Sequence, residues 1–256
     1  MDWIKRIAIC CCVPASVLLA WYLLYLYQGD SLRYAVNPFD VFYYISENVD
    51  QLLNNLWLSV IRIFWGVILG TTLGIFCGVL VARRNVLTAL FSPTLNVLAA
   101  VPIIVLIPFF LMIFGANQSF RIAVVTAVVF FIVYQTMFAV VKNFPKEYLD
   151  YAAHRKKSFK SIFYSLYLKS SIPELIKAIR LSLLFAWLAI VLAEKSVAQW
   201  PKGGLGYQII RAKELGHNVE MFSAVVVLAI SALLLDYFLK NLQIYASRWM
   251  DVREFD

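Results

Sequence analysis

The sequence predicts an all-α, polytopic membrane protein with six transmembrane helices. Hydrophobic residues make up 62% of the 256-residue chain and charged residues only 15%, and the mean hydropathy of +0.77 lies well above that of ordinary soluble domains. The apolar residues gather in six runs, each long enough to cross a hydrocarbon core of about 30 Å. These runs cover residues 7–27, 56–82, 94–114, 121–141, 172–198 and 221–245.

The net charge of +8 is carried largely by short basic clusters between the apolar runs. Clusters placed in this way follow the positive-inside rule, which explains them better than a nucleic-acid interface does, so we expect no nucleic-acid partner. The rule places the N-terminus, the 83–93 loop, the 142–171 loop and the C-terminal tail in the cytoplasm. Both termini are therefore expected on the cytoplasmic side.

The N-terminal segment is expected to be distinct from the rest of the chain. The first run follows Lys5 and Arg6, as a signal peptide would, but no small-x-small cleavage site follows it, which favours a retained anchor. The amphipathic run from Phe39 to Leu53 is expected to lie along the outer surface. We therefore predict an anchor helix and an external amphipathic segment over residues 1–55, and a five-helix core over residues 56–256.

The second run carries glycine at every fourth position and one cation. Gly66, Gly70, Gly74 and Gly78 predict a groove in which the backbone of another helix can approach closely. Arg62 lies about two turns inside the run, where an unpaired cation costs on the order of 3 kcal/mol at mid-membrane. It must pair, snorkel or face water. Snorkelling to the outer surface and a place in a translocation path that attracts an anion both remain open.

The third and fourth runs contain features that are typical of a pathway or of helix packing. Pro93, Pro102 and Pro108 are predicted to bend the third run, and broken helices often border a pathway. Gln135 and Thr136 are polar positions in the fourth run. They are candidates for the pathway, although hydrogen bonds between helices are the preferred interpretation.

Two carboxylates lie in the last two runs. Glu194 and Lys195 form a charge pair near the end of the fifth run, and Asp236 lies deep in the sixth. Asp236 must be satisfied by a partner helix or by water. A secondary transporter could use both carboxylates as proton or ion sites, but the internal repeats that would support that alternative are absent from the sequence.

No constellation of residues indicates enzyme chemistry. The glycines of the 203–206 run lack the Lys-Ser/Thr of a phosphate-binding loop, and His154 and His217 are predicted on opposite sides of the membrane. The four cysteines lie in apolar runs without the spacing of a zinc site or a disulfide framework. We therefore expect no catalytic residue, no metal ligand and no cofactor in this chain.

The 142–171 loop is a polar and basic interruption in an apolar sequence. Phe159, Ile162, Phe163 and Leu166 recur at helical spacing, which predicts an amphipathic helix at the membrane surface and suggests a docking site. A loop that only contacts anionic lipid headgroups would explain the lysines, but hardly the apolar stripe.

Several ordered motifs between residues 38 and 250 resemble the permease subunits of binding-protein-dependent ABC importers, in the branch that includes nitrate, bicarbonate, taurine and aliphatic-sulfonate permeases. The motifs are Ser59-x-x-Arg62-x-x-x-Gly66, Pro93 through Pro102 and Pro108 to Phe114-Gly115, Phe185-Ala186-Trp187-Leu188-Ala189 leading to Glu194, Gly204-Leu205-Gly206-Tyr207, and Leu234-Leu235-Asp236 ahead of Arg248-Trp249.

The resemblance implies a type I ABC importer permease-like fold in a bacterial inner membrane. It implies two ATPase subunits that bind ATP and Mg²⁺, a second permease chain, either identical or homologous, and a periplasmic or lipid-anchored substrate-binding protein. The solute is expected to be a small anion such as a sulfonate, nitrate or bicarbonate. Path residues suggested on this basis are Ser59, Arg62, Gln135, Thr136 and Glu194.

The resemblance also places a coupling helix, which docks on the ATPase, in the 142–171 loop. The family signature is Glu-Ala-Ala, three residues, Gly, nine residues, then Ile-x-Leu-Pro, and its register falls on Asp150-Tyr151-Ala152, Lys156 and Leu166-Tyr167-Leu168-Lys169. The expected docking residues are Asp150, Tyr151, Ala152, Ala153, Lys156, Phe159, Leu166 and Lys169.

Two positions of that signature depart from the family. Lys156 replaces the glycine and Lys169 the proline. A lysine at the end of the coupling helix either pays on the order of 1 kcal/mol for positive φ or continues the helix. The two cations favour an acidic cleft in the ATPase. We therefore expect either an ATPase adapted to this loop or a heteromeric complex with a second, regular permease. The alternative to a transport function is a permease-like scaffold in a heteromeric complex that no longer transports.

Overall fold

The computed structural model describes residues 15–27, 36–156, 158–196 and 203–251, and within these ranges it contains helices and no strands. The helices are Ala15–Tyr27, α2 (Pro38–Glu47), α3 (Val49–Arg83), α4 (Asn85–Ala100), α5 (Ile103–Phe114), α6 (Gln118–Lys142), α7 (Lys146–His154), α8 (Phe159–Ile162), the π-helix η2 (Phe163–Leu168), α9 (Lys169–Ser196), α10 (Leu205–Leu215) and α11 (Asn218–Asp251). The predicted all-α class is confirmed.

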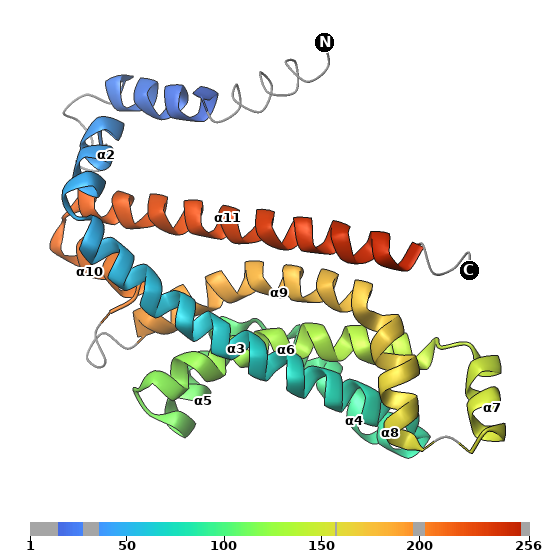
Figure 1. Cartoon of the computed structure of the whole chain (residues 1–256). Coiled ribbons are helices and arrows are strands. Elements are labelled where there is room, and N and C mark those ends of the chain that lie inside the picture. The colour runs from blue at the N-terminus through green and yellow to red at the C-terminus, as the bar shows by residue number, and fades with distance from the viewer. Residues whose placement is uncertain (1–14, 28–35, 157, 197–202, 252–256) are drawn as a thin grey trace, which may run out of the picture.

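Four helical segments are long and apolar enough to cross a membrane: Val49–Arg83, Gln118–Lys142, Phe163–Ser196 and Asn218–Tyr245. Figure 1 shows them running along the length of the molecule, with α2 and α10 at one end and α7 and α8 at the other. We call these the α10 end and the α7 end. At about 1.5 Å per residue, α3 is roughly 50 Å long and extends beyond a single hydrocarbon core.

The third predicted span is not one straight helix. A break at Val101 and Pro102 separates α4 from α5, and the chain bends there by 107°. A fifth candidate span is present only if these two helices are counted together as one span. Val101 has an extended backbone (φ −72°, ψ 124°), the conformation that a residue preceding proline prefers. Pro93 and Pro108 lie inside α4 and α5 without interrupting them.

Two predicted N-terminal boundaries change. Residues 7–14 of the first predicted span lie outside the described residues, and Ala15–Tyr27 is a short apolar helix. The amphipathic run that was expected from Phe39 to Leu53 ends earlier, because α2 stops at Glu47 and Val49–Leu53 already form the first turns of α3. At the start of α2, the Asn37 side chain accepts a hydrogen bond from the Phe39 N–H at 3.1 Å.

The glycine ladder of α3 packs directly on α6, as predicted. All four glycines are buried, and each faces a side chain or the backbone of α6. The α6 residues that they contact are Val125, Thr126, Val129, Val133, Tyr134, Met137 and Phe138. The absence of side chains lets the two backbones approach closely, so the main hydrophobic core forms along this seam.

We expect Gly70→Ala to reduce the free energy of unfolding by about 1–3 kcal/mol, the usual cost of overpacking. An added Cβ would lie 2.6 Å from the Val129 Cβ and 2.7 Å from the Thr126 carbonyl oxygen, so the helices would have to separate. Leu69→Ala is the control, because Leu69 is exposed on the other side of α3. Equal unfolding free energies for Gly70→Ala and wild type in lipid bicelles would contradict this packing.

Helix α10 completes the α10 end of the bundle. It packs on α9, α11 and α3, and a small core of Leu52, Leu205 and Ala224 joins α3, α10 and α11. Gly216 ends α10 in the left-handed conformation (φ 74°), and its position leads directly into α11. This arrangement brings the start of α10 against the inner faces of α3 and α9.

Candidate functional site

A buried ion pair joins α3 and α9 near the α10 end. Arg62 and Ser59 lie three residues apart on one face of α3, and Glu194 lies in the last turn of α9. All three side chains are at most 2% exposed. The Arg62 Nη1 donates to the Glu194 Oε1 at 2.5 Å. Of the possibilities open for Arg62, the structure therefore selects pairing.

Further hydrogen bonds hold both charged groups. The Ser59 hydroxyl donates to the Glu194 carboxylate, with its Oγ 2.9 and 3.1 Å from the two oxygens, and the Gly206 N–H donates to Oε2 at 2.8 Å. Arg62 donates through Nη1 to the Gly203 carbonyl at 2.9 Å and through Nε to the Gln118 Oε1 at 2.8 Å. The Arg62–Glu194 network, as we name these six residues, thus ties α3, α6, α9 and the start of α10 together.

Polar residues next to this network extend it toward α11. Asn55 donates to the Gln208 Oε1 at 2.8 Å and accepts from the Gly204 N–H at 3.1 Å, and Gln208 donates to the Glu220 Oε1 at 3.2 Å. Asn55, Gln118 and Gln208 were not among the predicted site residues. Asn55 carried a usable signal, because it shares the helical face of Ser59 and Arg62 at i, i+4 and i+7.

The glycine-rich turn before α10 has a structural explanation. Gly203 and Gly204 have φ values of 117° and 110°, a region that side chains disfavour. A Cβ on Gly204 would overlap the Glu194 carboxylate, and one on Gly206 would lie 2.7 Å from the Val191 Cα. These glycines let the backbone reach Glu194 closely enough for the Gly206 N–H to bind it.

A second buried arginine lies beside this network. Arg121, in the first turn of α6, is fully buried, although the sequence placed it in the outer flank of the fourth span. The charges of both Arg62 and Glu194 act on it. Two buried guanidinium groups and the buried Glu194 carboxylate therefore lie in this region, and the Glu220 carboxylate is joined to it through Gln208.

Gln135 and Thr136 do not join the other three candidate path residues. Gln135 is exposed, and Thr136 donates to the Ile132 carbonyl of its own helix at 3.0 Å, so neither makes the expected hydrogen bond to another helix among the described contacts. They lie about 25 Å along α6 from Gln118 at 1.5 Å per residue. The structure thus brings together only Ser59, Arg62 and Glu194.

At the opposite end, α7 presents the predicted docking residues. Tyr148 and Tyr151 are exposed, whereas Leu149 and Ala152 pack toward the bundle. Asp150 lies between them on α7, and the guanidinium of Arg155 lies 5.4 Å from the centre of the Tyr151 ring. The side chains of Ala153 and Phe159 lie outside the described residues. α7 is thus a short helix with an aromatic, polar outer face.

The amphipathic stripe of the loop is helical and runs into the spanning helix α9 without a break in the helical backbone. α8, η2 and α9 follow one another without a break from Phe159 to Ser196, and Ile162, Phe163 and Leu168 pack on the main core. Leu166 is half-buried within η2. These residues are helical, as expected, and Figure 1 shows the α8 segment at a steep angle to α9.

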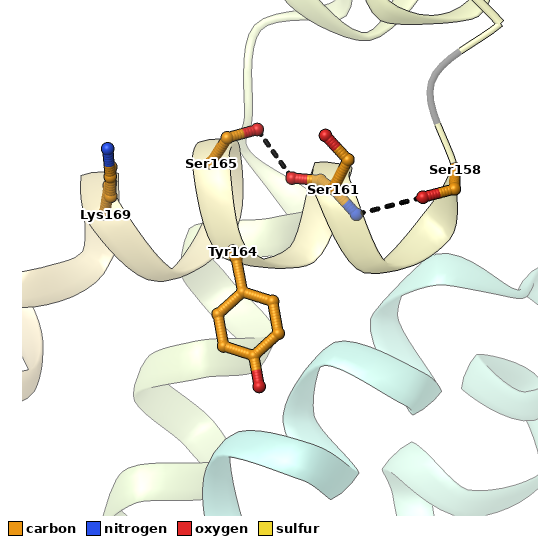
Figure 2. A pocket seen from close by; sticks show the side chains of 5 residues that line it. All are labelled: Ser158, Ser161, Tyr164, Ser165 and Lys169. Atoms are coloured by element: carbon orange, nitrogen blue, oxygen red, sulfur yellow. Dashed lines mark hydrogen bonds between the residues drawn. The ribbon is translucent and has the colours of Figure 1, made fainter.

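Lys169, at the position of the family's proline, allows this continuity. Its backbone N–H donates to the Leu166 carbonyl, a bond that proline could not make. Figure 2 shows the Lys169 side chain on the same side of the helix as the Ser161 and Ser165 hydroxyls, with Tyr164 on the other side. The Ser165 hydroxyl donates to the Ser161 carbonyl at 2.5 Å.

Lys156 has a backbone conformation that favours glycine. Its φ is 47°, and it is the single non-glycine residue with positive φ in the described part of the chain. Of the two expected outcomes, the lysine therefore takes the strained turn instead of continuing α7. The turn lies between α7 and α8, so the bend of the loop is retained.

Lys156→Gly should therefore raise the free energy of unfolding by roughly 1 kcal/mol, the cost of a side chain in the left-handed region. Lys156→Val should lower it, because a β-branched residue tolerates positive φ poorly. Lys146→Gly, in the first turn of α7, is a control for the glycine itself and should not stabilise the protein. A Lys156→Gly protein no more stable than wild type in bicelles would contradict the strained turn.

Known proteins match this chain over most of its length. Residues 70–252 match the family described as binding-protein-dependent transport system inner membrane component. The chain is 26% identical to a Bacillus subtilis protein described as an aliphatic sulfonates transport permease, SsuC, over 80% of this chain and 73% of that protein. It is 26% identical to the nitrate import permease protein NrtB of Leptolyngbya laminosa, over 81% and 72% of the two chains.

A structural match supports the fold. A chain of the MetNI methionine ABC transporter, in an inward-facing conformation, superposes with a TM-score of 0.66 at 18% identity, over 78% of this chain and 98% of that one. The sequence identity is low, so this match bears on the fold alone, which is that of a type I ABC importer permease. The family match covers more than two thirds of the sequence, and the chain therefore belongs to the inner membrane components of binding-protein-dependent ABC transport systems.

Proposed function

We propose that the chain is the transmembrane permease subunit of an ATP-driven importer, to which a substrate-binding protein delivers a small anion. The observation that carries this proposal is the placement of α7. It is a short exposed helix at one end of the bundle, and a single turn joins it to the continuous helix that runs from Phe159 to Ser196. A push on α7 would therefore be transmitted directly along a helix that crosses the membrane.

We propose two ATPase subunits, which bind ATP and Mg²⁺, and we place at α7 the docking site for one of them. Tyr148 and Tyr151 would supply aromatic contact area, and aromatic side chains are enriched at protein interfaces. Lys156 and Lys169 near the same end favour an acidic cleft in the partner. The turn at Lys156 supports a working coupling loop, because it separates α7 from α8.

The charged residues support an orientation for the chain. Arg83, Arg84, Lys142 and Lys146 lie at the α7 end, which the positive-inside rule places in the cytoplasm with both termini. The α10 end would then face the binding protein outside the bacterial inner membrane. The expectation of an anion is supported by the relatives, which are described as permeases for aliphatic sulfonates and for nitrate.

A second permease chain is expected to complete the pathway. Much of the apolar surface of α11 is uncovered within one chain, including Leu233, Leu234 and Phe238. Either lipid or a second copy can cover such a surface, and two permease chains around a two-fold axis would enclose a pathway that one chain only borders. The partner chain is either identical or homologous.

ATP hydrolysis by the reconstituted complex tests the proposal. The chain would be purified with the ATPase and the binding protein encoded beside it and reconstituted into proteoliposomes. We expect hydrolysis to be stimulated by the liganded binding protein, with accumulation of a sulfonate, nitrate or bicarbonate inside the vesicles. A stable complex without stimulation or accumulation would favour the scaffold alternative, for which the replacement of the family's proline by Lys169 is the supporting observation.

The composition of the complex is a separate test. A pull-down should recover an ATPase with an acidic cleft or a second permease chain together with this one. Two copies of this chain on an ATPase with an ordinary, non-acidic cleft would contradict the expected adaptation of the coupling loop.

A further inference from the structure

Helix α11 is attached to the bundle unequally along its length. Near the α10 end, Ser223 and Ala224 are fully buried, and the Ser223 hydroxyl donates to the Val41 carbonyl of α2 at 3.3 Å. Toward the α7 end, Leu233 and Tyr237 are 70% and 66% exposed. Figure 1 shows this half of α11 beside α9, which is its one neighbour among the described helices. The half of α11 near the α10 end, which we call the outer half, is therefore packed within the bundle. The half toward the α7 end, the inner half, has one neighbouring helix among those described.

The inner half contacts the bundle through an apolar stripe and one ion pair. Leu228, Ala232, Leu235 and Leu239 are partly buried against the main core. Asp236 lies between them and binds Arg180 of α9 in a bidentate manner, with Nε–Oδ1 at 2.6 Å and Nη2–Oδ2 at 2.9 Å. The expectation that a partner helix satisfies Asp236 is thus met.

The apolar stripe and the ion pair differ in how strongly they hold α11 against α9 in a bilayer. An apolar stripe gains little from packing on a helix, because lipid chains are as apolar as leucine. Separating Arg180 from Asp236, in contrast, would leave the Arg180 guanidinium without its carboxylate in an apolar environment. Arg180 also donates through Nη1 to the Gln243 Oε1 at 3.5 Å, about two turns further along α11. The ion pair is therefore the contact that favours α9 over lipid.

We propose that the Arg180–Asp236 pair is the mechanical link that makes α11 follow α9. α9 is continuous with α8 and η2 and thus with the turn that leads to α7, whereas the described chain joins α11 to α10 at the opposite end. The inference rests on the proposed function in one respect, namely that α7 is the segment moved by the ATPase. Arg180 and Asp236 act as positioning residues, and they need not contact the transported anion.

The choice of substitution depends on a neighbouring cation. Lys240 lies one turn beyond Asp236 on α11, and its charge acts on Asp236. When Arg180 is lost, Lys240 can neutralise Asp236, so substitution of Arg180 alone is a weak test. Asp236→Asn leaves Arg180 without its carboxylate and breaks the link directly.

Distances between spin labels test the link without reference to transport. Labels would be placed at Leu184 on α9 and Tyr237 on α11, which are both exposed, in the full-length chain with its native cysteines replaced, in lipid nanodiscs. We expect one narrow distance distribution for the otherwise unchanged protein, a broad one for Asp236→Asn, and a narrow one again for the charge exchange Arg180→Asp/Asp236→Arg.

Two controls separate this effect from a general loss of structure. A label pair at Phe76 on α3 and Gln135 on α6 should give the same distribution in every variant, because the glycine ladder holds that seam. Glu174→Gln removes a carboxylate that pairs with Lys177 within α9, and it should leave the α9–α11 distribution narrow. A narrow α9–α11 distribution in Asp236→Asn would overturn the proposal.

Uptake by the complex tests the consequence of the link. We expect Asp236→Asn to reduce anion uptake by about tenfold while ATP hydrolysis persists, and the charge exchange to restore most of it. Undiminished uptake together with a broadened α9–α11 distribution would overturn the mechanical role. Absence of uptake by the wild-type complex would refute the proposed function alone, and the label distances would still decide whether the pair holds the two helices together.

Discussion

Arg62→Met is expected to lower the free energy of unfolding by about 3–5 kcal/mol, because it leaves the Glu194 carboxylate charged and buried without its cation. Glu194 is fully buried, and the remaining donors, the Ser59 hydroxyl and the Gly206 N–H, are neutral. Arg62 also binds the Gly203 carbonyl and Gln118, so three connections between helices are lost at once. The measurement is the unfolding free energy of the purified chain in lipid bicelles.

The double variant Arg62→Met/Glu194→Gln supplies the control. It removes both charges while a glutamine at 194 can still accept hydrogen bonds from Ser59 and Gly206. Replacing both members of a buried ion pair by neutral groups is often nearly neutral, so we expect the double variant to be more stable than Arg62→Met. If both variants lose the same stability, the unpaired charge at Glu194 is not the cause.

Gly204→Ala is expected to cost about 3 kcal/mol, which combines left-handed backbone strain with overpacking. Gly204 has φ 110°, and its added Cβ would overlap the Glu194 carboxylate. The carboxylate would have to move away from Arg62 and from the Gly206 N–H, since both bind it in its present place. Thermal and denaturant unfolding in bicelles would measure the loss.

Gly216→Ala is the matched comparison. Gly216 also has positive φ, at 74°, but no atom lies within 4 Å of the position of its Cβ. It should therefore cost only about 1 kcal/mol, from backbone strain alone. Equal losses at Gly204 and Gly216 would show that the carboxylate does not occupy the space beside Gly204.

Features that depend on local periodicity could be predicted from the sequence. The apolar runs predicted the four long helices, because about twenty apolar residues are needed to cross a bilayer whatever their partners. The glycine ladder predicted a close helix contact, because Gly66 to Gly78 share one helical face. Neither prediction requires knowledge of which helices are neighbours.

The partners across the bundle could not be predicted in the same way. Arg62 and Glu194 are 132 positions apart, and nothing in the local sequence of either residue specifies the other. Gln118 and Gln208 look like ordinary polar residues at helix ends until the fold brings them to Arg62 and Asn55. The buried position of Arg121 likewise depends on how α6 packs on its neighbours.

Helix boundaries near proline and lysine were the other source of error. The sequence indicated a bend in the third span, but the 107° angle at Pro102 depends on the packing of α5. The stripe from Phe159 to Leu166 has the same periodicity in a surface helix and in the extension of a spanning helix. The backbone hydrogen bond at Lys169 shows that the stripe and α9 form one unbroken run of helix, which the periodicity alone does not reveal.

The central claim is that α7 receives force from a separate ATPase, and photo-crosslinking tests it most directly. A photoreactive phenylalanine would replace Tyr151 on α7 or Leu215 in the last turn of α10, both of which are exposed. In the assembled complex in membranes, the account predicts a crosslink from position 151 to the ATPase subunit and none from position 215. A crosslink to the ATPase from position 215, or its absence at position 151, would contradict the account.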